Sequence, residues 1–175
     1  MCAFAAKRPT NTYQEVELDE AVKKEALRLF TYGLYAVSVG AGERRNAFTA
    51  NWLGQVSFDP PLVALSIEND SASLPMIREA QRFVVNVFSA EQRELAGRLG
   101  KPLSRSADKL DGIALSETPS GQPYLADALG WVEITVESET PAGDSTLLLG
   151  RVADAGMLRT GEALTMRAAG FKHAG

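Results

Sequence analysis

The residues of this chain that are best suited to chemistry lie in one stretch, Asn46–Pro61, NAFTANWLGQVSFDPP. It reads as two short strands with a small polar cluster, Thr49–Asn51, and a rigid stop at Asp59-Pro60-Pro61. Small side chains let backbone N–H and C=O groups approach a flat ligand whose edge carries both donors and acceptors. The alternative is a plain hairpin strand with a polar outer face, and the residues of this stretch by themselves favour that alternative.

A second candidate site precedes the helix expected over residues 74–80. The segment Asn69–Ser73 supplies hydroxyl groups beside a helix N-terminus, which is a ready site for an anion such as a phosphate. Arg78 or Arg82 would lie nearby. The alternative is that Ser73 only caps the helix, and the aspartate within the segment disfavours an anion there.

Other catalytic chemistries fit the sequence poorly. The block GDSTL at Gly143–Leu147 superficially resembles a serine esterase motif, but a nucleophilic serine needs a base beside it. The single histidine, His173, has no acidic partner shortly before it. One histidine and one cysteine, Cys2, exclude an internal disulfide and a histidine-rich metal site. A site made of carboxylates alone is the remaining alternative, but no such spacing stands out, so we expect no metal. No Gly-x-Ser-x-Gly elbow, dinucleotide fingerprint or Walker loop is present.

Composition restricts the class of protein further. A chain of 175 residues with 45% hydrophobic residues is long and apolar enough for one domain with a packed core. The formal charge of −4 and the lack of a basic cluster disfavour nucleic acid as a partner. No apolar run approaches a membrane span, and the N-terminus lacks the charged region of a secretory signal. We therefore expect a cytoplasmic protein that binds neither nucleic acid nor a membrane.

The apolar pattern predicts the elements that would position these residues. Helical spacing runs from Leu18 to Phe30 with Asp19 as N-cap, and a capping box of Ser89 and Gln92 opens another helix that Gly100 ends. Six segments read as strands: 35–39, 47–52, 62–67, 83–87, 131–137 and 146–153.

These elements favour an antiparallel, barrel-like α+β domain, because strands and helices do not alternate regularly. We expect residues 1–14 to form an N-terminal arm and residues 15–175 to form the domain. Residues 101–130 are irregular and long for a compact domain, which predicts a lid or a dimer-packing arm.

The order and spacing of several blocks resemble the flavin reductase-like family of FMN-binding split barrels. The most specific part is Thr49-Ala50-Asn51-Trp52 followed by Ser57-Phe58-Asp59-Pro60-Pro61-Leu62. Further matching blocks are Tyr32–Val39, Phe83–Val87, Gly143-Asp144 and Gly150–Val152.

This resemblance implies a mainly β, six-stranded antiparallel split barrel of Greek-key type with short flanking helices, and a homodimer with FMN near the subunit interface. FAD is the alternative flavin, and NAD(P)H would be the co-substrate. The implied flavin-binding residues are Asn46, Thr49, Ala50, Asn51, Trp52, Gln55, Ser57, Ser66, Asn69, Ser71 and Ser73. Asp144 and Ser145 would line the catalytic cleft.

One departure from the family pattern bears on function. Reductases of this family usually have histidine after Gly-Asp, where this chain has Ser145. A serine forms hydrogen bonds but carries no imidazolium charge. The first hypothesis is an NAD(P)H:flavin oxidoreductase that passes electrons to free flavin, oxygen or a partner protein. The alternative is a non-catalytic FMN-binding electron-transfer protein, and a lesser one is a split barrel that binds another cofactor, such as haem through His173.

Overall fold

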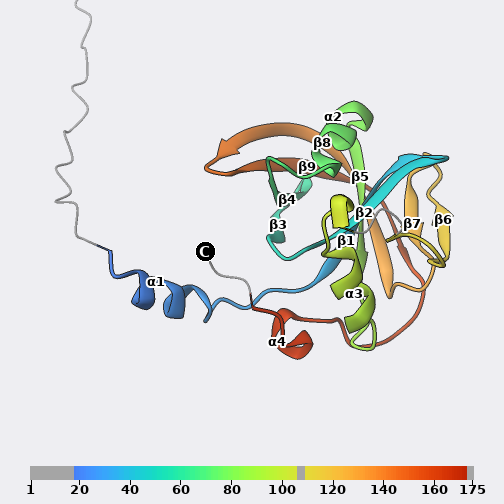
Figure 1. Ribbon diagram of the computed structural model, residues 1–175. Helices are drawn as coiled ribbons and strands as arrows, with labels where there is room; N and C mark the ends of the chain where they lie inside the picture. Colours follow the sequence, from blue (N-terminus) through green and yellow to red (C-terminus); the bar gives the residue numbers. More distant parts are fainter. Residues whose placement is uncertain (1–17, 106–108, 173–175) are drawn as a thin grey trace, which may run out of the picture. The chain divides into compact units, whose positions relative to one another are not determined.

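The structure is a computed structural model that describes residues 18–105 and 109–172 (Figure 1). The predicted arm at residues 1–14, and Cys2 and His173, lie outside the described residues. The chain divides into two units at Phe30, and the second unit runs from Thr31 to Lys172. The predicted domain boundary at residue 15 stays a prediction.

In the first unit the described part is one helix, α1 (Glu20–Leu27). The carboxylate of Asp19 accepts hydrogen bonds from the backbone N–H groups of Ala21 and Val22, at 2.9 and 3.1 Å. The predicted N-cap is confirmed, because this oxygen satisfies N–H groups that have no partner within the helix. The helix ends at Leu27, earlier than its apolar spacing predicts.

The second unit is built on one antiparallel sheet of seven strands in the order β2-β1-β5-β8-β9-β4-β3. The strands are β1 (Tyr35–Ala41), β2 (Arg44–Ala50), β3 (Leu53–Phe58), β4 (Pro61–Glu68), β5 (Arg82–Val87), β8 (Gly130–Ala142) and β9 (Ser145–Met157). Strands β4 and β5 follow each other in sequence but are separated in the sheet by β8 and β9. This crossover is the kind of long connection that a Greek key contains.

Short elements surround the sheet. They are α2 (Ser73–Ala80), α3 (Arg93–Leu99), the 3₁₀ helix η1 (Leu103–Arg105), the hairpin of β6 (Leu115–Glu117) and β7 (Pro123–Leu125), and α4 (Met166–Ala169). Helix α2 packs against β1, β2 and β5, and α3 packs against β1 and β2. The prediction of a mainly β fold with short helices is confirmed.

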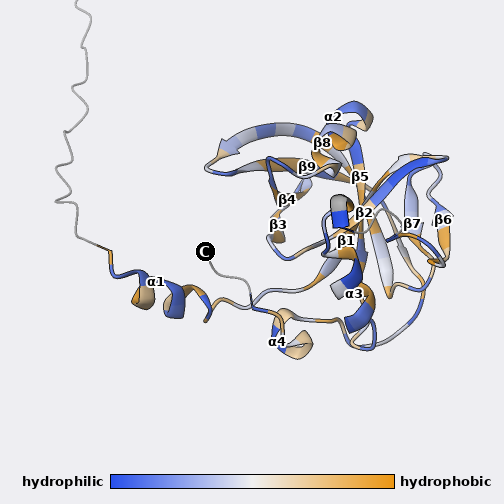
Figure 2. Cartoon of the chain, viewed as in Figure 1, coloured by the Kyte–Doolittle hydropathy of each residue, from blue (hydrophilic) through white to orange (hydrophobic). Residues whose placement is uncertain are grey.

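Two apolar cores explain why β1 has apolar residues on both of its faces. Val37 and Val39 point into a core inside the curved sheet, whereas Leu34 and Ala36 point into a second core under α3 and α4. Both faces of the strand are buried, so the alternation of a half-buried strand is lost. The tip of the β1–β2 hairpin is hydrophilic (Figure 2), and Arg44 at the start of β2 is exposed.

The structure corrects three details of the predicted fold. The sheet has seven strands instead of six, because β3 (Leu53–Phe58) is a separate strand. Residues 101–130, predicted to be irregular, contain η1 and the β6–β7 hairpin. Only half of the capping box forms: Gln92 accepts from the N–H of Ser89 at 2.9 Å, but the Ser89 hydroxyl has no partner and α3 begins at Arg93.

Within residues 18–105 and 109–172, no helix combines the length and the apolar character that crossing a membrane requires.

Candidate functional site

A cleft of about 320 Å³ lies where three segments distant in sequence meet. Strand β2 supplies one wall, the β4–α2 connection supplies another, and the C-terminal end of α3 with the segment after it supplies the third. The lining residues are Asn46, Phe48, Thr49, Glu68, Asp70, Ser71, Ala72, Ser73, Leu99, Gly100, Lys101, Pro102, Leu103 and Lys109. Four of the predicted flavin-binding residues, Asn46, Thr49, Ser71 and Ser73, are therefore brought together here.

Asn46 and Ser73 form a buried polar pair at the cleft. The Asn46 amide nitrogen donates to the Ser73 hydroxyl oxygen at 2.8 Å, so the hydroxyl proton of Ser73 is free to donate to another group. The amide oxygen of Asn46 is buried and has no hydrogen-bond partner in the structure. A buried acceptor without a partner is destabilising, and a ligand that donates a hydrogen bond in the cleft would satisfy it.

The start of α2 differs from the prediction that Ser73 caps it. The N-cap is Ala72, whose side chain makes no capping bond, and the N–H of Ser73 lies 3.4 Å from the Ser71 hydroxyl oxygen. Ser73 faces Asn46 instead. Since the capping alternative is wrong for Ser73, its buried hydroxyl is available to the cleft.

A side-chain hydrogen bond from Thr49 links β2 to α3. Its hydroxyl donates to the backbone carbonyl of Ala96 at 2.7 Å, which fixes the end of the helix beside the strand. A side chain on Gly100 would lie 3.4 Å from the same carbonyl oxygen and 3.9 Å from Thr49. Both are ordinary van der Waals distances and Gly100 has a right-handed helical conformation, so this end of α3 does not require a glycine.

Two lysines place positive charge on the cleft. Lys101 is exposed, whereas Lys109 is 3% exposed, and burial lowers the pKa of the Lys109 ammonium below its ordinary value. Glu68 and Asp70 bring negative charge to the opposite part of the lining. A phosphate would therefore be attracted towards the lysine side.

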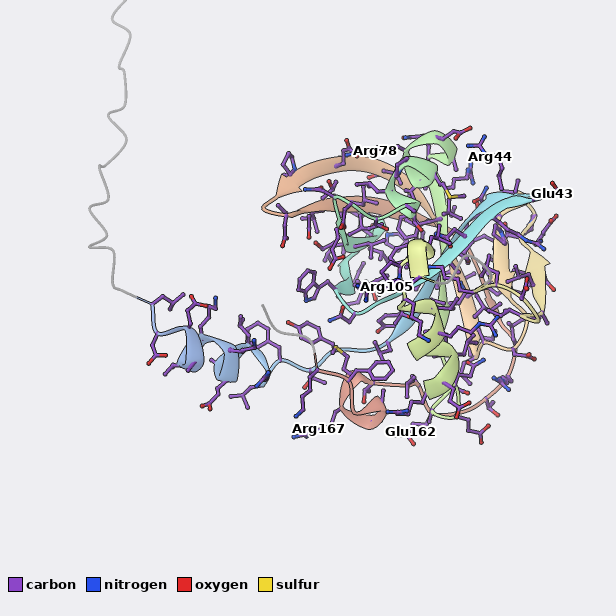
Figure 3. All side chains as sticks on the ribbon, in the orientation of Figure 1. Glu43, Arg44, Arg78, Arg105, Glu162 and Arg167 are labelled. Atoms are coloured by element: carbon purple, nitrogen blue, oxygen red, sulfur yellow. The ribbon has the colours of Figure 1, made fainter. Side chains whose placement is uncertain are left out.

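The arginines suggested from the sequence lie elsewhere. Arg78 extends from α2 towards β8 (Figure 3), and its Nε donates to the Glu139 carboxylate at 2.9 Å. Arg82 donates to Glu133 at 2.8 Å. Neither arginine lines the cleft. Both are held in ion pairs, so the cations available to a ligand there are the two lysines.

Five further predicted residues lie along the β2–β3 connection and β3–β4, outside the lining of this cleft. The Asn51 amide donates to the sulfur of Met166 at 3.2 Å, and the Ser66 N–H donates to the Trp52 carbonyl at 2.9 Å. Gln55 donates to the carbonyl of Ser57 across a bulge in β3. Ala50, also predicted, is buried in the inner core. The structure thus places these predicted residues outside the cleft lining, and their roles stay predictions.

Asp144 and Ser145 form a separate group with Asn69 at the β8–β9 turn. The Ser145 hydroxyl donates to the Asp144 carboxylate at 3.0 Å, and Ser145 is buried. The Asn69 N–H donates to the Asp144 carbonyl, and its side-chain oxygen accepts from Thr146 at 2.8 Å. None of these three predicted residues lines the cleft, and their roles stay predictions.

The sequence interpretation missed the third wall of the cleft. Leu99, Lys101, Leu103 and Lys109 lie in and after α3, where no local motif singles them out. Gly100, which the sequence predicts as the end of this helix, is the one nearby signal that could have directed attention to them. Among the residues that the structure describes, no group of three or more His, Cys, Asp or Glu side chains is placed to hold a metal.

Comparison with known proteins shows the family of this chain. The family model described as "Flavin reductase like domain" matches residues 27–174. The chain is 36% identical over 143 residues to the high molecular weight rubredoxin of Moorella thermoacetica, covering 81% of this chain and 62% of that protein. It is 35% identical over 144 residues to the NADH-dependent FMN reductase AsuE2 of Streptomyces nodosus subsp. asukaensis, covering 80% of this chain and 75% of the reductase.

A solved structure shows the same architecture. BorF, the flavin reductase component of a bacterial two-component tryptophan halogenase, superposes with a TM-score of 0.74 at 28% identity, over 86% of this chain and 95% of BorF. The chain belongs to the flavin reductase like domain family. It spans between 25% and 62% of the length of three of the curated relatives that it matches.

Proposed function

We propose that this protein binds FMN and acts as an NAD(P)H:flavin oxidoreductase. The observation that carries the proposal is the cleft beside β2, where the buried Asn46–Ser73 pair and two lysines meet in a chain of this family. Similarity to proteins named NADH-dependent FMN reductase and NADH:FMN oxidoreductase supports the same activity.

The residues of the cleft fit one end of a phosphorylated flavin. Ser71 and Ser73 offer hydroxyl donors at the start of α2, and Lys101 and Lys109 offer ammonium groups from the opposite wall. The unpartnered oxygen of Asn46 fits a ribityl hydroxyl, which is a hydrogen-bond donor. We infer that the phosphate end of FMN lies in this cleft.

The ring system would lie along the backbone of Thr49–Trp52. The small side chains of Thr49–Asn51 leave room for close approach, and Gln55, Ser57, Ser66 and Asn69 are the further polar contacts that we propose. FAD would need room beyond the phosphate for its adenosine part, so FMN is the preferred flavin and FAD the alternative.

A flavin bound here would accept a hydride from the nicotinamide of NAD(P)H. The protein contributes binding and orientation: serines and lysines hold the anionic end, and the β2–β3 backbone holds the ring edge. We expect Asp144 and Ser145 to affect the nicotinamide side. Because Ser145 is buried and donates to Asp144, its contribution would be to orient the carboxylate of that neighbour.

The second candidate function is electron transfer between a bound FMN and a protein partner. Two observations favour it: Ser145 replaces the usual histidine, and one relative is named a rubredoxin and not a reductase. In either case reduced flavin or its electrons would pass to a partner. BorF, the reductase component of a two-component system, supports a partner enzyme as recipient.

We also propose a homodimer with the flavin near the subunit interface. Strand β3 is an edge of the sheet, and Val56 and Phe58 on it are 58% and 90% exposed. Large apolar side chains on a free edge strand are typical of an interaction surface.

Two measurements test the proposed function. Purified protein should be yellow or take up FMN with a change in flavin fluorescence; a colourless protein that binds no FMN would contradict both candidates. Stopped-flow mixing with NADH or NADPH should bleach the bound flavin. If FMN binds but neither nucleotide bleaches it, the electron-transfer function is favoured. A Ser145→His variant should bleach faster if this position governs nucleotide use.

A further inference from the structure

Lys109 is buried at the cleft, and no carboxylate among the described residues forms an ion pair with it. Among the described residues, its Nζ contacts only the carbonyl oxygens of Leu99 and Lys101, at 3.5 and 3.4 Å. These distances are long for an N–H···O bond, so the contacts are weak. Both carbonyls lie at the C-terminal end of α3, which attracts a cation but does not cancel its charge. The ammonium is therefore poorly compensated while the cleft holds no anion.

Arg98 holds the segment that carries Lys109. Its Nε donates to the backbone carbonyl of Lys109 at 2.7 Å, and its Nη2 donates to the carbonyl of Asp111. The guanidinium thus bridges α3 to two carbonyls of the following loop. Two fixed contacts from one planar group restrict both the position and the direction of the backbone at Lys109.

We propose that Arg98 is a positioning residue that aims Lys109 at the phosphate of a bound flavin, and that this pair makes the site select phosphorylated flavins over riboflavin. The inference rests on the proposed function and deepens it. Arg98 itself does not line the cleft, so its effect on a ligand passes through the backbone of Lys109.

The physical argument is one of charge and geometry. A phosphate would give the buried ammonium a counter-charge that none of the described residues supplies, and burial strengthens that attraction because water screens it less. Riboflavin has the same ring and ribityl chain but no phosphate, so it leaves the lysine uncompensated. Removing the ammonium should therefore weaken FMN binding and leave riboflavin binding nearly unchanged.

The experiment measures the dissociation constants of FMN and riboflavin at fixed salt, by quenching of flavin fluorescence, in the full-length chain. Lys109→Met should weaken FMN binding about tenfold or more, as expected when a charged donor is lost, and change riboflavin binding by less than about twofold. Arg98→Met should show a large part of the same selective loss. Arg98→Lys should be intermediate, because one ammonium cannot reproduce the planar fork.

A double variant and a matched control separate positioning from general damage. If Arg98 acts through Lys109, the double variant should bind FMN no more weakly than Lys109→Met alone. Arg93 is the control: it lies on the same helix and its Nε also donates to a backbone carbonyl at 2.7 Å, that of Ala169. Arg93→Met should leave the ratio of FMN to riboflavin affinity unchanged.

The outcomes distinguish failure of the proposed function from failure of the inference about Arg98 and Lys109. A wild-type protein that binds neither flavin overturns the proposed function and this inference with it. If the wild type binds FMN but Lys109→Met keeps the FMN-to-riboflavin ratio, only the inference is overturned. It is also overturned if Arg98→Met weakens both flavins equally, or if the losses of the two single variants add in the double variant.

Discussion

Among single residues, Asn46 affects both the stability of the protein and, in our proposal, the binding of its ligand. Its nitrogen is used by Ser73, but its buried oxygen has no partner in the protein. Burying an acceptor without a hydrogen bond destabilises the ligand-free protein. The Asn46 oxygen can gain a partner when a ligand binds. Asn86 in the same sheet differs, because both its nitrogen and its oxygen already form hydrogen bonds within the protein.

The variant Asn46→Leu should therefore affect FMN binding more than the stability of the ligand-free protein. Ligand-free protein should lose little stability, because removing the unsatisfied oxygen offsets part of the cost of losing the hydrogen bond to the buried Ser73 hydroxyl. FMN affinity should fall about tenfold, since a ligand donor loses its acceptor. Thermal unfolding without flavin and FMN titration measure the two effects. Unchanged FMN affinity would contradict the role given to Asn46.

Glu133 is the other buried polar residue with a defined physical effect. It is 1% exposed and accepts hydrogen bonds from Ser120 and Arg82, at 2.6 and 2.8 Å. Burial raises its pKa, but hydrogen bonds from Ser120, Thr118 and Arg82 and the charge of Arg82 lower it more, so the pKa lies below its usual 4.5. The ionised carboxylate is thus favoured by folding.

The sign of the pH effect follows from that depression. The contribution of Glu133 is fully present above about pH 4.5 and is lost as the pH falls through the lower pKa of the folded state. Glu133→Gln should therefore destabilise the protein most near neutral pH, and its difference from the wild type should shrink as the pH falls below about 4.5. Urea unfolding from pH 7 to pH 3 measures this. A difference that stays constant over that range would show that the charge is not involved.

The control for this variant is Glu139→Gln, which removes an ion pair with Arg78 between two half-exposed side chains. Such a pair contributes less than about 1 kcal/mol, so this change should have little effect at neutral pH.

On the scale of elements, the β6–β7 hairpin depends on one buried side chain of β5. Asn86 donates to the carbonyl of Ala36 and the hydroxyl of Ser38, at 3.0 and 2.9 Å, and accepts from the N–H of Leu125 at 2.7 Å. The Ser38 hydroxyl in turn donates to the carbonyl of Pro123. These bonds fasten the hairpin to β1 and β5.

Asn86→Leu should loosen this attachment and destabilise the protein by at least about 2 kcal/mol, because several buried backbone and hydroxyl groups lose their partners together. Thermal or urea unfolding measures the loss, and hydrogen exchange should show faster exchange of the Leu125 amide. Asn69→Leu is the comparison: Asn69 is exposed and bonds to Thr146 through one side-chain contact, so its loss should be smaller. Equal losses would show that the Asn86 network does not hold the hairpin.

The elements differ in how well the sequence predicts them, for physical reasons. The apolar runs of β1, β4 and β5 are visible because the core lies against them. Strand β3 is suggested by the two-strand interpretation of Asn46–Pro61 but is missing from the six predicted strands, because Gln55, Val56 and Phe58 are exposed and a bulge shifts its register. The residues of β2 in the cleft could be found from spacing and family resemblance. Lys109 could not, because its place depends on Arg98, eleven positions earlier, and on a loop without periodicity.

On the scale of the whole molecule, the exposed apolar side chains on the edge strand β3 suggest contact with a second subunit. In a symmetric dimer the same patch lies on both subunits, so Val56 and Phe58 of each would be buried by the other. A phenylalanine that moves from nearly full exposure into an interface contributes substantially to association, and symmetry counts each side chain twice. Self-association through β3 would also bring the surface beside the β2–β3 connection close to a second subunit.

We therefore expect the double variant Val56→Ser, Phe58→Ser to weaken the dimer at least about tenfold. Sedimentation velocity over a range of protein concentrations measures the dissociation constant. Met157→Ser is the matched control, since Met157 is 81% exposed on β9 and away from β3, and it should leave the dimer unchanged. FMN titration at concentrations above and below the dimer constant then relates assembly to the site: if the flavin lies near the interface, FMN affinity should fall with dissociation. A monomeric wild type, or a double variant that stays fully dimeric, would contradict an interface at β3.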